Sequence, residues 1–127
     1  MAVIIDTYAW MEYFRGSEAG RRVRGRIEEG RNITPTIVLA EISKRFTDLD
    51  RGDLKEKLAF IHSKSNILPL DQSTAIMAGQ IRSTIGIKDM GLVDCILLAA
   101  ARTHGIKVLT GDRHFRSLKE AEYFGTK

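Results

Sequence analysis

Short apolar runs alternate along the chain with longer stretches of mixed polarity, and this pattern predicts strands alternating with helices. Val3–Ile5 is an uninterrupted apolar run that ends at an acid, which is typical of a buried strand. The run 108–110 has the same character, while 32–34 and 67–70 are weaker candidates. The proline of the latter favours a place at an edge of the sheet or at the end of the strand. Strands and helices in this alternation favour a parallel sheet covered by helices on both faces.

The stretches between these runs carry the start and stop signals of helices. A helix predicted over 8–14 ends at Gly16, and Ser17 is the expected N-cap of a second helix that runs to Gly30. Apolar positions at helical spacing predict further helices over 53–61, 72–85 and 92–104.

A third helix is predicted to start at a Thr-Pro pair. Thr34 is the expected N-cap and Pro35 the first helical residue, where the missing N–H of proline costs nothing. Apolar positions from Ile37 to Phe46 continue this helix, with Glu41 in its middle.

Length and composition indicate a single globular domain over 1–127. A chain of 127 residues can bury about two-thirds of the surface that its unfolded form exposes. No apolar run approaches the roughly 20 residues that span a membrane. The single cysteine, Cys95, has no partner for an internal disulfide and lies in an apolar stretch, which predicts a buried thiol. We therefore expect a cytoplasmic protein that does not enter a membrane.

The net charge of +4 permits a nucleic-acid partner without requiring one. Basic residues form two local groups, and each group taken alone is typical of a solvated helix face. These groups are Arg15, Arg21, Arg22, Arg24 and Arg26, and then Arg113, His114, Arg116 and Lys119.

Four acids stand out by their place in this pattern. Asp6 and Asp112 directly follow strands, although a helix cap and a turn are ordinary roles for acids there. Asp94 lies in the first turn of an apolar helix, where the helix dipole favours a carboxylate. Glu41 lies mid-helix among apolar residues, so it must reach solvent, pair with a cation or bind a metal.

Taken together, these acids predict a metal site. Ligands of such sheets bind beyond the carboxyl ends of the strands, so the four side chains can converge in one cleft. At an effective dielectric near 20, two unit charges about 4 Å apart repel by roughly 4 kcal/mol, so the cluster needs protons or a divalent cation. Carboxylates without thiols or a histidine cluster favour Mg²⁺ or Mn²⁺ over zinc. Such a metal suits phosphoryl transfer, with the basic groups holding a nucleic-acid backbone.

Four segments, in order, also resemble the motifs of PIN-domain toxins of the VapC type. The opening VIIDTYAWMEYF resembles the family's first motif, and TPTIVLAEISKRF resembles the second. The segment GLVDCILLAAARTHGIKVLTGDRHF resembles the third and fourth motifs. The acids and hydroxyl residues of the family correspond, in chain order, to Asp6, Thr7, Glu41, Asp94, Thr110 and Asp112.

This resemblance implies a PIN-like three-layer α/β fold with a central, mostly parallel sheet of about five strands flanked by helices. It implies an endoribonuclease that uses Mg²⁺ or Mn²⁺ and leaves 5′-phosphate and 3′-hydroxyl ends. The four acids would be its metal ligands and catalytic residues, and the two threonines would support them by hydrogen bonds. For the toxin branch, the resemblance also implies a homodimer and a small antitoxin protein.

Other interpretations stay open at this point. A PIN scaffold that binds RNA or a protein without cutting is the main alternative, although clustered acids hinder RNA binding. A phosphate-transfer receiver domain also gathers acids at strand ends, but it normally has paired acids after its first strand and a lysine after its last. Asp89 is a further acid whose expected role is to solvate a loop. Stacking on bases is the less favoured interpretation, against packing in the core or a dimer interface, for Tyr8, Trp10, Tyr13 and Phe14.

Overall fold

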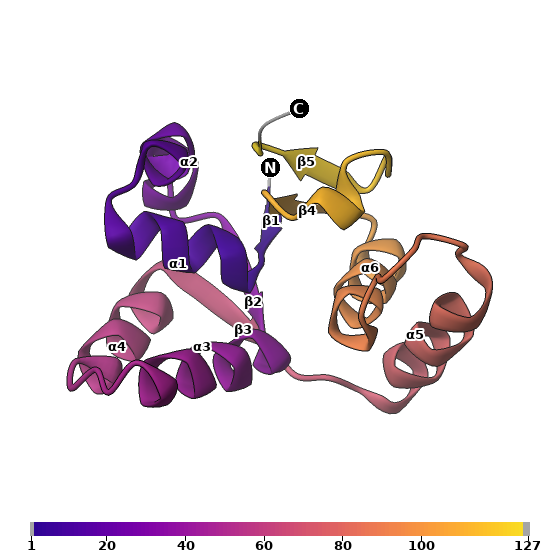
Figure 1. Cartoon of the computed structure of the whole chain (residues 1–127), viewed down its shortest axis with the longest axis horizontal. Helices are drawn as coiled ribbons and strands as arrows, with labels where there is room; N and C mark the ends of the chain where they lie inside the picture. Colours follow the sequence, from indigo (N-terminus) through magenta and orange to yellow (C-terminus); the bar gives the residue numbers. More distant parts are fainter. Residues whose placement is uncertain (1, 126–127) are drawn as a thin grey trace.

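A computed structural model of the chain describes residues 2–125 and contains one sheet of five strands (Figure 1). The strands lie in the order β3-β2-β1-β4-β5, and every neighbouring pair is parallel. The predicted α/β fold with a central parallel sheet of about five strands is therefore confirmed. The strands are β1 Val3–Ile5, β2 Asn32–Pro35, β3 Ser65–Leu68, β4 Lys107–Thr110 and β5 Ala121–Tyr123.

The helices cover both faces of this sheet, with α1 to α4 on one side and α5 and α6 on the other (Figure 1). Parallel connections are right-handed, so a chain that steps from β1 to β3 and then returns to β4 must change faces. No helix in the described part of the chain is long and apolar enough to cross a membrane. The helices are α1 Thr7–Arg15, α2 Glu18–Glu28, α3 Thr36–Asp48, α4 Leu54–Lys64, α5 Gln72–Thr84, α6 Leu92–His104 and the 3-10 helix η1 Arg113–Phe115.

The direction of the chain across the sheet reverses between β1 and β4. β1 leads to β2 on one side, whereas β4 leads to β5 on the other. The connections therefore diverge from the carboxyl ends of β1 and β4, and a crevice forms at such a point. Because Ile5 pairs with Leu109, the residues that follow in register, Asp6 and Thr110, lie side by side at this crevice.

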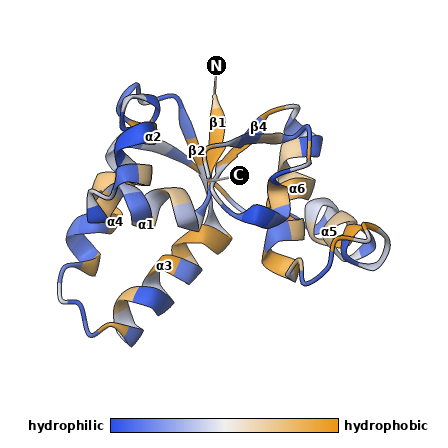
Figure 2. Cartoon of the chain, turned by 45° about the horizontal axis from the view of Figure 1, so that its top comes forward, coloured by the Kyte–Doolittle hydropathy of each residue, from blue (hydrophilic) through white to orange (hydrophobic). Residues whose placement is uncertain are grey.

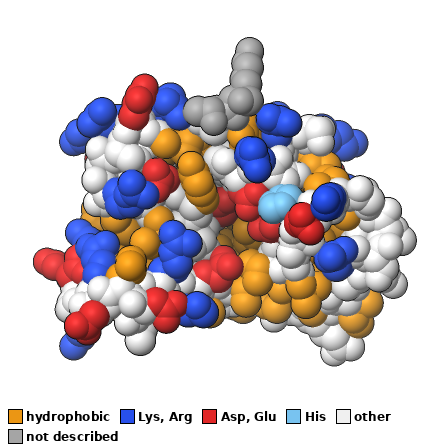
Figure 3. Space-filling view, in the orientation of Figure 1, with side chains coloured by type: hydrophobic (Ala, Val, Ile, Leu, Met, Phe, Trp, Pro, Cys, Tyr) orange, Lys and Arg blue, Asp and Glu red, His pale blue; other side chains and the backbone are white. Residues whose placement is uncertain are grey.

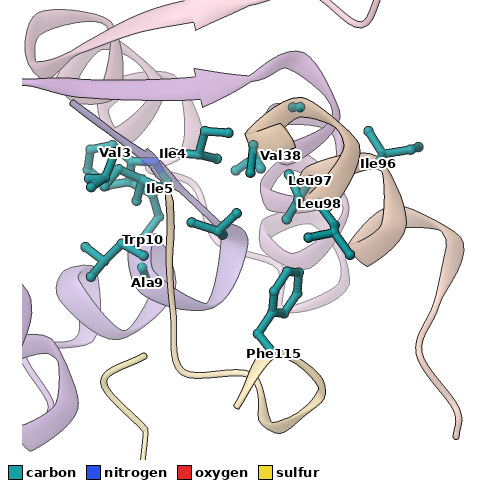
Figure 4. Close-up of a cluster of buried hydrophobic side chains, with 14 of the residues drawn as sticks. Val3, Ile4, Ile5, Ala9, Trp10, Val38, Ile96, Leu97, Leu98 and Phe115 are labelled. Carbon is teal, nitrogen blue, oxygen red and sulfur yellow. The ribbon is translucent and has the colours of Figure 1, made fainter. Parts of the chain in front are cut away.

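The hydrophobic core fills the space between the sheet and its two helix layers. All three residues of β1 are buried, and Figure 2 shows this strand as hydrophobic. α6 is buried at every position from Cys95 to Ala101, so the free thiol of Cys95 is inside, as predicted. Phe115 of η1 points toward Leu98 of α6 and fixes the segment after β4 on the core (Figure 4).

The helix ends follow the local signals of the sequence. Gly16 and Gly105 end α1 and α6 in the left-handed conformation, with φ of 65° and 63°. Ser17 and Asp71 cap α2 and α5, because each side chain accepts a backbone N–H at the start of its helix.

The predicted start of the third helix is wrong. Thr34 and Pro35 belong to β2, and α3 begins at Thr36. The Thr34 hydroxyl accepts the indole N–H of Trp10 at 3.1 Å and lies 2.6 Å from the Ser65 hydroxyl. These contacts hold the Thr34 side chain inside the sheet layer, so it does not cap α3. Pro35 takes the N-cap position without a side-chain hydrogen bond.

Two strands also differ from their prediction. β3 spans Ser65–Leu68 instead of 67–70, because α4 passes directly into it and Pro69, which has no N–H to donate, follows its end. Its edge position is as predicted. β5 was not located from the sequence, because its three partly buried residues form no apolar run and depend on pairing with β4.

At Gly20 the backbone of α2 lies directly against the backbone of α1. A Cβ at this position would lie 2.1 Å from the Glu12 carbonyl oxygen. Gly20→Ala must therefore separate the helices, and we expect a loss of about 1–3 kcal/mol in unfolding free energy. Gly25→Ala, in the same helix with open space around the new methyl, should gain about 0.5–1 kcal/mol. Urea unfolding measures both changes, and equal effects would contradict this account.

Candidate metal centre

A pocket of about 360 Å³ opens at the crevice beyond β1 and β4. Five acids line it: Asp6 after β1, Glu41 of α3, Asp94 of α6, Asp112 after β4, and Glu12 of α1, which the sequence had not singled out and which pairs with Arg15 at 3.0 Å. Figure 3 shows acidic side chains in the hollow between the two helix layers, with Lys and Arg side chains around it. The structure therefore brings together all four acids that the sequence singled out, whereas Asp89 is exposed in a loop and does not line this pocket.

Asp6 is almost fully buried at the junction of β1 and α1, with 4% of its surface exposed. Its Oδ1 accepts the Ala9 backbone N–H at 2.7 Å, so it is the N-cap of α1. Burial raises the pKa of Asp6 to about 7 against the lowering effect of hydrogen bonds from Thr110 and Ala9, and repulsion from Asp112 and Asp94 adds to the rise. A carboxylate has about four lone-pair sites, so capping α1 leaves room for another ligand.

Asp94 and Asp112 form a tight group with His114. One potential ligand atom of each residue lies within 4.8 Å of the other two, and no other such group was found among residues 2–125. His114 Nδ1 is 2.7 Å from Asp112 Oδ1 and 3.7 Å from Asp94 Oδ2. Burial, with repulsion from Asp112 as the second cause, raises the pKa of Asp94 to about 6.

Two threonines hold these acids in place. The buried Thr110 hydroxyl is hydrogen-bonded to Asp6 and accepts the Asp112 backbone N–H at 3.0 Å. Thr7 Oγ1 donates to Glu41 Oε1 at 2.5 Å, so it joins α1 to α3 across the pocket wall and does not cap a helix. Glu41 stands outside the tight group and affects the pKa of Asp94 less than Asp112 does.

Three basic side chains at this pocket received no individual role in the sequence analysis. His114 was grouped with the basic residues, although the Asp-x-His spacing after a strand lets the turn of η1 fold its imidazole back onto Asp112. Arg15 and Arg45 line the pocket from α1 and α3. Arg15 and Arg45 lie near the ends of their helices and reach the pocket only through the packing of α1 and α3, so their spacing in the sequence does not predict this position.

The two basic groups of the sequence face the site only in part. Arg24 and Arg26 are engaged in ion pairs with Glu28 and Glu122. Surface ion pairs of this kind stabilise the fold little, but they occupy the guanidinium groups. Fewer of these basic side chains are therefore available to hold a nucleic-acid backbone than their number in the sequence suggests.

The donor set fits a divalent cation. Asp6 and Asp94 retain protons to about pH 7 and 6 because burial and mutual repulsion disfavour their charged forms. A bound dication relieves both effects at once, since it supplies opposite charge where solvent is excluded. Carboxylate oxygens are the ligands that Mg²⁺ and Mn²⁺ prefer.

The sequence matches the PIN domain family over residues 3–121, so the chain belongs to this family. No curated protein matches the chain in sequence.

Solved structures share this fold over nearly the whole chain. A chain of a toxin–antitoxin complex from Klebsiella pneumoniae is 18% identical with a TM-score of 0.77, and the match covers 98% of this chain and 99% of that one. VapC20 from Mycobacterium tuberculosis, described as a toxin that cleaves the sarcin–ricin loop, is 16% identical with a TM-score of 0.75, over 92% and 95%. A chain of FitAcB from Neisseria gonorrhoeae is 25% identical with a TM-score of 0.68, over 97% and 94%. The PIN-like fold is therefore confirmed.

The raised pKa of Asp6 predicts that the site destabilises the metal-free protein. The unfolded chain ionises Asp6 near its ordinary pKa of 3.8, whereas the folded protein holds the proton to about 7. The folded state therefore binds the Asp6 proton more tightly than the unfolded chain does. The stability that this proton contributes is fully present below about pH 4 and is lost as the pH rises to about 7. In EDTA, Asp6→Asn should therefore melt at the same temperature as the wild type near pH 4 and about 4 °C higher or more near pH 8.

Asp71→Asn is the matched control for this measurement. Asp71 also caps a helix through its Oδ1, but it is exposed, and the Thr74 backbone N–H lowers its pKa. Its substitution should therefore not raise the melting temperature at either pH. A melting temperature of Asp6→Asn that stays at or below the wild-type value near pH 8 would contradict the prediction.

Proposed function

We propose that this protein is a divalent-metal-dependent endoribonuclease and the toxin of a VapBC-type toxin–antitoxin pair. The observation that carries the proposal is the pocket at the β1–β4 crevice of a PIN-family chain, which is lined by Asp6, Glu41, Asp94 and Asp112 together with Glu12. Two structural neighbours support it, because one is a chain of a toxin–antitoxin complex and the other is a toxin that cleaves the sarcin–ricin loop.

Asp6, Glu41, Asp94 and Asp112 would hold Mg²⁺ or Mn²⁺ in this proposal, directly or through water. When bound, such an ion would lower the pKa of a water molecule and neutralise charge on the phosphate. Attack of water on phosphorus, with release of the 3′ oxygen, would leave 5′-phosphate and 3′-hydroxyl ends.

Four further polar side chains around the acids have positioning roles in the proposal. Thr110 keeps Asp6 and Asp112 together through its two hydrogen bonds, and Thr7 orients Glu41. Arg45, and Arg15 in its ion pair with Glu12, line the pocket where a phosphate at the acids needs counter-charge. Their guanidinium groups suit phosphate oxygens because they present several N–H donors in one plane.

The proposed partners follow from the same family. We expect RNA as the substrate, a small antitoxin that blocks the pocket, a homodimer and a place of action in the cytoplasm. The buried free thiol of Cys95 agrees with a reducing compartment.

Cleavage of a mixed pool of structured RNA tests the activity. The purified protein is expected to cut the pool in Mg²⁺ or Mn²⁺ and not in EDTA. Asp94→Asn and Glu41→Gln should each lower the rate at least about 100-fold, since even groups that merely support metal ligands contribute about 10- to 100-fold. Glu56→Gln is the matched control, because Glu56 is exposed on α4 and does not line the pocket, and it should cleave like the wild type.

Two outcomes would count against the nuclease. Binding of RNA without cleavage in any metal would favour the non-catalytic scaffold. Cleavage that persists in EDTA and in both variants would show that the carboxylates are not the catalytic site.

A further inference from the structure

Tyr8 is the aromatic side chain that borders the acidic pocket. It stands two residues after Asp6 and lines both this pocket and an adjoining, wider groove of about 970 Å³. It keeps 41% of its surface exposed, and no other Phe, Tyr or Trp within residues 2–125 is in the exposed class. Its neighbours along the chain behave differently, since Trp10 is buried and packs with the partly buried Tyr13 and Phe14.

The fold holds the Tyr8 ring from one side. A Cβ on Gly111 would lie 2.3 Å from Tyr8 Cε1, so the ring rests directly on the glycine backbone after β4. Phe124 supports it with ring centroids 5.7 Å apart and planes tilted by 55°. Within the described residues the Tyr8 hydroxyl has no hydrogen-bond partner, so the ring itself is what these contacts position.

Cations lie on both sides of Tyr8. Arg15 and Arg45 line the acidic pocket, and Arg22, Lys88 and Arg113 line the adjoining groove, which also contains Glu12, Glu18 and Asp89. Figure 3 shows Lys and Arg side chains around the hollow on this face. Arg15 and Arg22 are paired with Glu12 and Glu18. A phosphate at the acids therefore has Arg45 and Arg113 on either side of Tyr8 as counter-charge, and the base next to it has an aromatic face within reach.

We propose that Tyr8 stacks on the nucleobase next to the phosphate held at the acids, and this inference rests on the proposed function. A base inside a duplex is covered by neighbours on both faces, so stacking on Tyr8 requires a base that is free to turn outward. Tyr8 is a positioning residue, which aligns the backbone by holding the adjacent base.

A combination of protein and RNA changes tests this contact. Stacking contributes about 1–3 kcal/mol per base, which corresponds to about 5- to 150-fold. At a cleavage site mapped in the RNA pool, removing the adjacent base should lower wild-type kcat/KM by such a factor. Tyr8→Leu, which keeps apolar volume on Gly111, should show the same loss with intact RNA and little further loss with the abasic RNA. Tyr8→Phe keeps the ring and should retain the sensitivity to base removal.

Binding provides a readout that does not depend on cleavage. A short mixed-sequence single-stranded RNA and a base-free ribose-phosphate chain of equal length are compared by fluorescence anisotropy in Ca²⁺. The wild type should prefer the RNA with bases, and Tyr8→Leu should lose about 5-fold or more of that preference. Leu49→Ala, which removes another exposed apolar side chain that lies outside both pockets, is the control and should keep it.

The outcomes separate this proposal from the proposed function. Binding with a Tyr8-dependent preference for bases, but without cleavage, would support the stacking site and contradict the proposed nuclease activity. If Tyr8→Leu and removal of the base lower kcat/KM independently, so that their effects multiply, or if neither lowers it, the stacking site is overturned while the nuclease activity is still supported. A failure of the wild type to bind either chain would overturn the stacking site, and melting temperatures of the variants near the wild-type value exclude misfolding as the cause.

Discussion

The confinement of several carboxylates in one pocket is the constraint on which the rest of this structure depends. Asp6 is buried where solvent cannot stabilise its charge, and Asp94 and Asp112, which line the same pocket, repel it. The chain compensates only in part, with the N–H groups at the start of α1 and the Thr110 hydroxyl. Such a site persists because the surrounding structure leaves these side chains no other position.

The topology supplies that rigidity. β1 is the central strand and β4 lies beside it, and their pairing positions the two chain segments that carry Asp6 and Asp112. The apolar face of α6 anchors the helix that carries Asp94, while Phe115 fixes the turn after Asp112 against the core. On the other side, the contact of Gly20 with α1 holds the first helix layer, and Thr7 ties that layer to Glu41. The contacts that stabilise the helix layers thus also position the acids of the pocket.

The sequence predicted those features that local chemistry decides. The apolar run of β1 and the caps Ser17 and Asp71 act through neighbours in the chain, and the order of the four acids along the motifs placed them at one edge. Thr34 was misassigned because its hydroxyl partners, Trp10 and Ser65, come from distant segments. The roles of Arg15, Arg45 and His114 depend on how helix ends and a 3-10 turn project, which periodicity does not encode. The catalytic roles of the acids remain predictions.

The most direct test of this account is a crystal structure of the protein in Mn²⁺, with the anomalous scattering of manganese used to locate the ion. The account predicts an anomalous peak in the acidic pocket, within coordinating distance of carboxylate oxygens from at least two of Asp6, Asp94 and Asp112. A pocket that contains no manganese at saturating concentration, with the same acids hydrogen-bonded to each other or to water, would contradict the central claim that these carboxylates are assembled to hold a divalent cation.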